Sequence, residues 1–129
     1  MVNYGFTKGL NVPYEAVIGQ MTEALKKEGF GVQIQIDVQA SIKEKLDIDM
    51  GKYIILGACS FPNAYKSILA EEDIGLMFPW NIIVYEKDGK TVLSVIRPTV
   101  SMQMVDNAEI QIISEEVEGK LKAAFDSVK

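Results

Sequence analysis

The chain has 129 residues, 48% of them hydrophobic and 24% charged, which is typical of one ordinary globular domain. The formal net charge is −5 and the single arginine is Arg97, so we expect no nucleic-acid partner, because phosphate binding relies on clustered cations. The chain has no histidine and one cysteine, Cys59, which excludes Ser-His and Cys-His catalytic pairs, histidine-bearing zinc sites and an internal disulfide.

The first elements follow from local periodicity. In residues 2–7 apolar and polar side chains alternate weakly, which predicts a strand. Residues 11–30 predict a helix, with Pro13 in its first turn, Gly29 as a left-handed stop residue and Phe30 folding back onto Leu25. Its apolar stripe has the i, i+3, i+4, i+7 spacing of one helix face. The stripe consists of Tyr14, Val17, Ile18, Met21 and Leu25.

The middle of the chain predicts alternating strands and short helices. Residues 31–37 alternate, which places Val32, Ile34 and Ile36 on one face of a strand whose other face is wet. Residues 38–49 predict a short helix with Ser41 as its cap. Residues 52–58 are continuously apolar and predict a central strand. A second short helix is expected over residues 63–73, ending before Gly75.

The last third carries the strongest local signal. Two β-rich runs within residues 76–96 flank Asp88-Gly89, the residue pair of a tight hairpin turn. Residues 97–105 are expected to be extended or irregular, because Pro98 ends the strand. A helix follows from Asp106 to the end of the chain. Its apolar stripe is Ile110, Ile113, Val117, Leu121, Ala124 and Val128.

Together these elements predict a single α+β domain over residues 1–129, with an antiparallel-rich sheet and helices on one of its faces. The other face of such a two-layer domain needs either a polar surface or a partner.

Four stretches resemble an uncharacterised bacterial and archaeal family, domain of unknown function 302, over essentially the whole chain. They are EGFGVQIQIDVQASIKEKL, YIILGACSFPNA, IGLMFPWNIIVYE and the KDGK hairpin. Trp80 departs from the family pattern, because it stands where the family often has a second cysteine, and CSFPNA departs from the usual Cys-Asn-Pro. The matching residues are Gly29, Phe30, Asp37, Lys45, Gly57, Cys59, Gly75, Pro79 and Asn81.

The resemblance implies a fold like that of the TATA-binding protein, with a β-α-β-β-β-β-α core, extra short helices and a dimeric state. It implies no activity, because none is established for the family. A shared fold does not transfer DNA binding, and the acidic charge opposes it.

Cys59 has two interpretations. If Ser60 caps the next helix, the thiol lies near the positive end of the helix dipole, which lowers the pKa of a cysteine and favours a catalytic thiolate. In relatives with both cysteines a pair can cycle between dithiol and disulfide, whereas Trp80 removes that partner here. The alternative is a small buried residue that ends a central strand.

Pro79, Trp80 and Asn81 form a second candidate group. Trp80 can form one wall of an apolar pocket with Asn81 supplying a hydrogen bond, or it can fill the core or a dimer interface.

Asp37, Lys43 and Lys45 form a third group. Asp37 is expected to cap or bracket the helix that carries the lysines, and Lys45 to reach a carboxylate or a bound anion, unless the group is only a solvated ion pair. An extended segment would also place Met102 and Met104 on one side, a pattern that fits Cu(I) less well than simple packing.

The leading interpretation is a small homodimeric domain of the cytoplasm that binds a small molecule or a protein partner without catalysis. The expected ligand-binding residues are Asp37, Lys45, Cys59, Pro79, Trp80 and Asn81. The rival interpretation is a thiol-dependent redox enzyme or sulfur carrier that uses Cys59. We expect no cofactor, no metal and no membrane, because no apolar run reaches the roughly 18 residues of a span and no signal peptide is visible.

Overall fold

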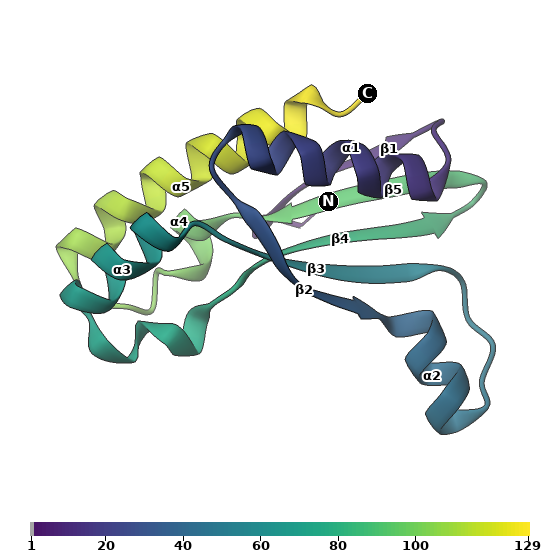
Figure 1. The fold of residues 1–129 in the computed structure, drawn as a ribbon, viewed down its shortest axis with the longest axis horizontal. Helices are drawn as coiled ribbons and strands as arrows, with labels where there is room; N and C mark the ends of the chain where they lie inside the picture. The colour runs from purple at the N-terminus through teal and green to yellow at the C-terminus, as the bar shows by residue number, and fades with distance from the viewer. Residues whose placement is uncertain (1) are drawn as a thin grey trace.

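A computed structural model describes residues 2–129, and within this range five strands form one antiparallel sheet in the order β1-β5-β4-β3-β2. The long helices α1 and α5 lie side by side on one face of that sheet (Figure 1). The elements in chain order are β1 (Gly5–Leu10), α1 (Tyr14–Lys27), β2 (Gly31–Asp37), α2 (Val38–Leu46), β3 (Tyr53–Cys59), α3 (Phe61–Ala70), the 3-10 helix η1 (Glu72–Met77), β4 (Trp80–Lys87), β5 (Lys90–Ile96), α4 (Pro98–Ser101) and α5 (Ala108–Ser127).

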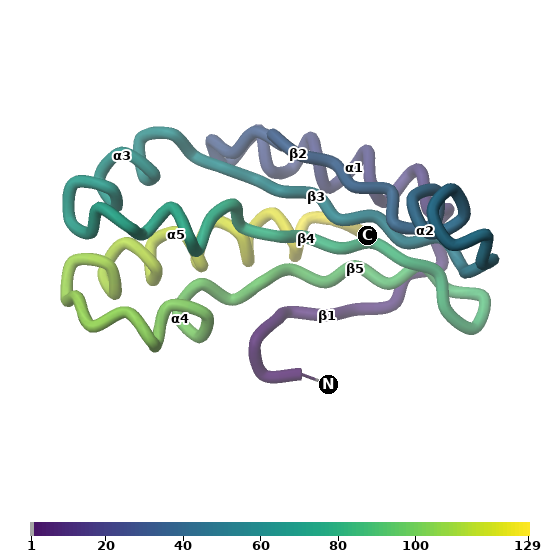
Figure 2. The backbone as a smooth tube through the Cα atoms, turned by 90° about the horizontal axis from the view of Figure 1, so that it is seen from below, coloured from purple at the N-terminus to yellow at the C-terminus, as the bar shows by residue number. Residues whose placement is uncertain are grey.

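The predicted α+β class and the β-α-β-β-β-β-α core are both confirmed. The short elements α2, α3, η1 and α4 are extra helices in the connections between core elements. Seen from below, the strands run side by side from β2 to β1, with α2 at one end of the sheet and α3 at the other (Figure 2). The sheet is therefore a two-layer platform with short helices at both ends.

The end of α1 has the predicted geometry. The backbone N–H of Phe30 donates to the carbonyl of Leu25 (2.8 Å), and the N–H of Gly29 donates to that of Lys26 (3.0 Å). Gly29 has φ +86°, a conformation that costs glycine little because it lacks a Cβ. Pro13 lies one residue before the helix rather than in its first turn.

The predicted hairpin is also confirmed. Asp88 and Gly89 have φ values of 52° and 76°, the two positive angles of a tight turn whose twist matches that of the flanking strands. Lys87 and Lys90 are the paired residues that directly flank this turn.

The core lies between the sheet and the two long helices. Asn107 begins α5, because its side-chain oxygen accepts hydrogen bonds from the N–H groups of Glu109 (3.0 Å) and Ile110 (3.3 Å). The predicted stripe of α5 is buried except for Ile113, which is half-buried. Across from it the sheet contributes Ile54, Leu56, Ile82, Val84, Leu93 and Val95.

Three sequence-based boundaries need correction. The first strand covers Gly5–Leu10 rather than residues 2–7, and α3 begins at Phe61 rather than at residue 63. The segment after Arg97 is not extended. Pro98 is instead the first residue of the short helix α4. At that position the missing N–H of proline costs no hydrogen bond.

Candidate functional site

The face of the sheet turned away from α1 and α5 is here called the open face. Residues paired across antiparallel strands share a face, and the face alternates along each strand. Since Ile54, Leu56 and Ile82 are buried under the helices, their neighbours in sequence belong to the open face. Its members include Ile34, Ile36, Tyr53, Ile55, Cys59, Asn81, Ile83, Tyr85, Val92, Ser94 and Ile96.

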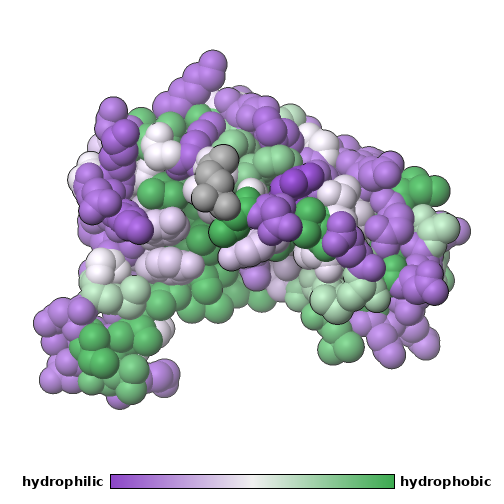
Figure 3. Space-filling view, turned by 180° about the vertical axis from the view of Figure 1, so that it is seen from behind, coloured by the Kyte–Doolittle hydropathy of each residue, from purple (hydrophilic) through white to green (hydrophobic). Residues whose placement is uncertain are grey.

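This open face is largely apolar. Ile34 and Ile36 are 46% and 45% exposed, although a solvated face of a two-layer domain normally carries polar side chains. Tyr53 and Tyr85 stack on each other with ring centroids 5.4 Å apart. The underside of the molecule shows as a continuous band of hydrophobic residues (Figure 3). The second face of the sheet is therefore not the polar surface that was one of the two options drawn from the sequence.

A bulge in β2 produces part of this surface. Val32 pairs with Ala58 on the helix-covered face, whereas Ile34 pairs with Gly57 on the open face, and the register shifts between them. The prediction that Val32, Ile34 and Ile36 share one face is therefore wrong for Val32. A bulge of one residue inverts the face of everything that follows it.

Short helices give the open face a concave shape. At one end α2 projects below the sheet and at the other end η1 does so, which gives the molecule the outline of an arch (Figures 1 and 3). Under the arch lies a hollow of about 150 Å³ between β1, β4 and β5. Its lining includes Tyr4, Asn81, Ile83, Ser94 and Ile96.

Three of the six predicted site residues lie together on or beside the open face. Asn81 is exposed at the hollow, and Cys59 is half-buried at the end of β3. Pro79 packs against β3 at Gly57, where an added Cβ would lie only 2.6 Å from the Pro79 Cγ and 3.3 Å from the Ile34 Cβ. Gly57 is thus the residue that admits the proline ring.

Trp80 points the other way. It pairs with Ala58 on the helix-covered face, is 6% exposed, and meets the Phe78 ring edge-on at 5.3 Å. The structure therefore places it in the core rather than in the wall of a surface pocket, which is the second of the alternatives drawn from the sequence.

Asp37 and Lys45 lie at the other end of the sheet, around α2. Asp37 caps α2, because its carboxylate accepts a hydrogen bond from the Ala40 N–H (3.0 Å), and the expected capping role of Ser41 is wrong. Lys43, not Lys45, forms the ion pairs of this region, to Asp47 (2.9 Å) and to Asp49 (3.2 Å). Those hydrogen bonds raise the pKa of Lys43. Lys45 is exposed on α2.

The environment of Cys59 does not favour a thiolate. Burial raises the pKa of the thiol, opposite to the effect expected beside a helix N-terminus. Ser60 stands at the start of α3, but its hydroxyl accepts a hydrogen bond from the Asn63 side chain (3.3 Å) instead of capping the helix. Cys59 thus has the surroundings of a packing residue.

The two methionines considered for Cu(I) are separated. Met102 is buried, whereas Met104 is 79% exposed, because the turn after α4 replaces the expected extended segment. Over residues 2–129 no group of three Cys, Asp or Glu side chains is placed to hold a metal ion.

A two-layer α+β domain with a concave apolar sheet face is the class that fold and site define. The family model for domain of unknown function DUF302 matches residues 6–128, so the chain belongs to that family. The crystal structure of an uncharacterised conserved protein DUF302 from Bacillus stearothermophilus is similar, with 26% sequence identity and a TM-score of 0.92, over 99% of this chain and 100% of that one. No curated protein matches the sequence. In the described part of the chain, no helix is both long and apolar enough to cross a membrane.

The sequence singled out Cys59, Pro79 and Asn81, which the structure brings together, but the apolar character of the surface they share was missed. The available signal was the pair Ile34 and Ile36, which the alternation placed on one face and which we expected to be buried. Only the bulge in β2 and the position of α1 decide whether these two side chains lie on the helix-covered face or on the open face.

Proposed function

We propose that this protein is a non-catalytic binding domain of the cytoplasm that works as a homodimer and binds a protein partner on the open face of its sheet. One observation carries the proposal: Ile34 and Ile36 are about half exposed on a concave face whose other members are mostly apolar. Contiguous exposed apolar surfaces of this kind mark interaction sites.

The size of the open face favours a protein over a small molecule. A sheet of this width, with strands about 4.8 Å apart and about six residues long, presents roughly 480 Å² before α2 and η1 add their inner sides. That is more than half of the roughly 800 Å² that each partner contributes to a standard interface. By contrast, the hollow at Asn81 holds about 150 Å³, whereas small-molecule sites usually measure about 300–1,000 Å³.

The expected partner presents a surface rich in aliphatic and aromatic side chains, because the open face offers mainly isoleucine, valine and tyrosine side chains. Homodimerisation remains compatible with such binding, because α3 carries a second apolar surface at the far end of the molecule.

Site-specific photo-crosslinking tests this proposal in cells that make the protein. A photoreactive amino acid is placed at Asn81 on the open face, and a matched control at Lys26, an exposed position on α1. We expect one discrete protein, identified by mass spectrometry, to be captured from position 81 but not from position 26. The purified candidate must then bind the wild-type chain and lose at least tenfold in affinity for Ile36→Asp.

Two outcomes contradict the proposal. If native mass spectrometry finds a small molecule bound to the wild-type chain and position 81 captures no protein, the open face is a ligand site. If the Ile36→Asp variant, shown to be folded by circular dichroism, binds the candidate as tightly as the wild type, the open face is not the contact.

A further inference from the structure

Helix α3 has its polar and apolar sides reversed. Its inward side carries Asn63 and Ser67, which are 6% and 3% exposed. Its outward side carries large apolar side chains at spacings of three and four residues, the spacing of one helix face. These are Phe61, Tyr65, Ile68 and Leu69, with exposed fractions of 65%, 65%, 44% and 69%, and they are here called the α3 stripe.

The side chains on the inward side of α3 are small, because this side packs against α5 and η1. Asn63 and Ser67 are satisfied within the helix: the Ser67 hydroxyl donates to the Asn63 carbonyl (2.8 Å), and the Asn63 amide donates to Ser60 Oγ (3.3 Å). The helix is therefore stable in its place without the α3 stripe, which leaves the stripe available for another molecule.

We infer that α3 is the contact between two copies of this chain, packed antiparallel across a two-fold axis near Tyr65. This inference rests on the homodimer proposed above and states where that dimer forms. A two-fold contact requires one patch that complements itself, so that residue i meets residue j and j meets i.

The α3 stripe meets this requirement. With Tyr65 on the axis, residues whose numbers add up to 130 face each other, so Phe61 of each copy meets Leu69 of the other, and the two Tyr65 rings meet at the centre. Lys66 is the only charged side chain within α3, and it stands beside the stripe rather than in it. The centre of the contact is therefore apolar, as interface centres usually are.

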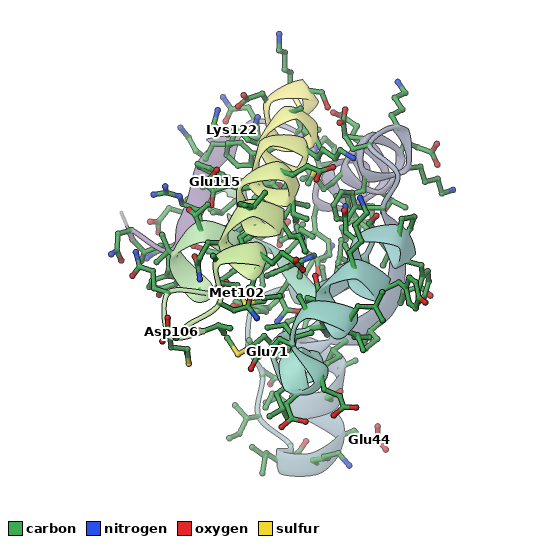
Figure 4. The ribbon with its side chains drawn as sticks, turned by 90° about the vertical axis from the view of Figure 1, so that its left-hand side faces the viewer. Glu44, Glu71, Met102, Asp106, Glu115 and Lys122 are labelled. Carbon is green, nitrogen blue, oxygen red and sulfur yellow. The ribbon has the colours of Figure 1, made fainter. Side chains whose placement is uncertain are left out.

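Charge complementarity favours the antiparallel arrangement. Glu71, Glu72 and Asp73 follow directly after α3; the Glu71 carboxylate accepts a hydrogen bond from the Asn107 side chain (3.0 Å), whereas Glu72 and Asp73 are exposed. In an antiparallel pair these two exposed carboxylates lie near the N-terminus of the partner helix, where the helix dipole favours negative charge. Figure 4 looks onto this end of the molecule, with α3 in front, Glu71 at its lower end and Asp106 on the adjoining loop. A parallel pair would instead bring the acidic ends of the two copies together.

The area is sufficient for a weak dimer. Aromatic side chains bury about 150–250 Å² each, so the four partly exposed side chains of the stripe offer on the order of 400 Å² per copy. Two copies then bury about 800 Å² from the stripe alone, and the flanks of α3 bring the total close to the roughly 1,000 Å² of a specific contact. We expect dissociation in about the micromolar range.

A disulfide placed on the predicted axis tests this geometry. In the Cys59→Ala background, Tyr65→Cys brings two thiols together only if Tyr65 of one copy faces Tyr65 of the other. We expect a mild oxidant to convert most of this variant to a covalent dimer at micromolar concentration. The matched controls are Ile36→Cys on the open face and Lys26→Cys on α1, which we expect to stay mostly monomeric under the same conditions.

Sedimentation of the wild type and of Tyr65→Lys completes the test, because two lysines on the axis repel each other. We expect the wild type to dimerise in a concentration-dependent manner and Tyr65→Lys to remain monomeric with an unchanged circular dichroism spectrum. If the wild type dimerises but the disulfide forms in the Ile36→Cys variant and not in the Tyr65→Cys variant, the α3 contact alone is overturned. A wild type that is monomeric at 200-fold the expected dissociation constant would overturn the homodimer, and crosslinking from Asn81 would still test the open face separately.

Discussion

At Gly57 a single hydrogen in place of a side chain decides how closely two segments approach. An added Cβ would lie 2.6 Å from the Pro79 Cγ, so either the ring or the strand would have to move. We expect Gly57→Ala to lower the free energy of unfolding by about 1–3 kcal/mol, the usual cost of overpacking, measured by urea denaturation. Gly19→Ala is the control, because its Cβ meets open space on α1, and we expect it to raise stability by about 0.5–1 kcal/mol. Equal effects of the two changes would contradict this packing argument.

The pH dependence of alkylation tests the interpretation of Cys59. Burial raises the pKa of the thiol, so the reactive thiolate forms only at a higher pH than in an unfolded chain. We expect iodoacetamide labelling of the folded protein to reach half its maximal rate above the reference pKa of about 8.5, and to be slower at pH 7 than labelling in urea. Because a raised pKa keeps the proton on the folded state, stability falls as the pH rises through this range. Rapid labelling with a half-point below pH 7 would restore the thiol-enzyme interpretation.

Single residues were predictable where their role is set by neighbours in sequence, and not where it depends on the face of a strand. The prediction that Cys59 ends a strand is confirmed, but alternation alone does not tell which of Trp80 and Asn81 faces the helices. That depends on pairing with β3 and on the bulge in β2, both of which are set by tertiary packing.

Among the elements, α5 depends on a side chain from the opposite end of the chain. The Lys8 ammonium group donates to the carbonyls of Phe125 and Val128, both at 2.6 Å, and lies 4.4 Å from the centre of the Phe125 ring. We expect Lys8→Met to lower the free energy of unfolding by about 1–2 kcal/mol, because it removes a cation from the negative end of the helix dipole and leaves two carbonyls unpaired. Thermal unfolding measures this, with Lys90→Met as the control, because Lys90 is exposed on a strand and lies at no helix end. Equal melting temperatures for Lys8→Met and the wild type would rule this role out.

Elements whose ends are set locally were predicted well. The Gly29 stop and the Asp88-Gly89 turn depend on a few consecutive residues, and the structure confirms both. By contrast, α4 was missed because Pro98 both ends a strand and suits a first helical turn. The reversed orientation of α3 was also missed, since its apolar spacing is that of an ordinary buried helix face and only the packing against α5 shows otherwise.

For the whole molecule, the sequence was sufficient for the fold class but not for the surfaces. The order of elements defines a two-layer domain, and the structure adds apolar surfaces that remain outside the core, among them the open face and the α3 stripe. They lie on different elements, so one chain can hold a second copy through α3 while its open face binds another protein. The two contacts can therefore be tested with separate variants, Tyr65→Lys and Ile36→Asp.

The pairing of β1 with β5 also determines the order in which this domain can be completed during synthesis. Phe6 pairs with Val95, and Lys8 reaches the carbonyl of Val128, so the earliest strand waits for almost the entire chain. The β4–β5 hairpin, by contrast, needs only neighbouring residues and can form as soon as it leaves the ribosome. A nascent chain thus carries an unpaired first strand at least until β5 has been made, and such an unpaired strand edge is open to wrong pairing with other chains.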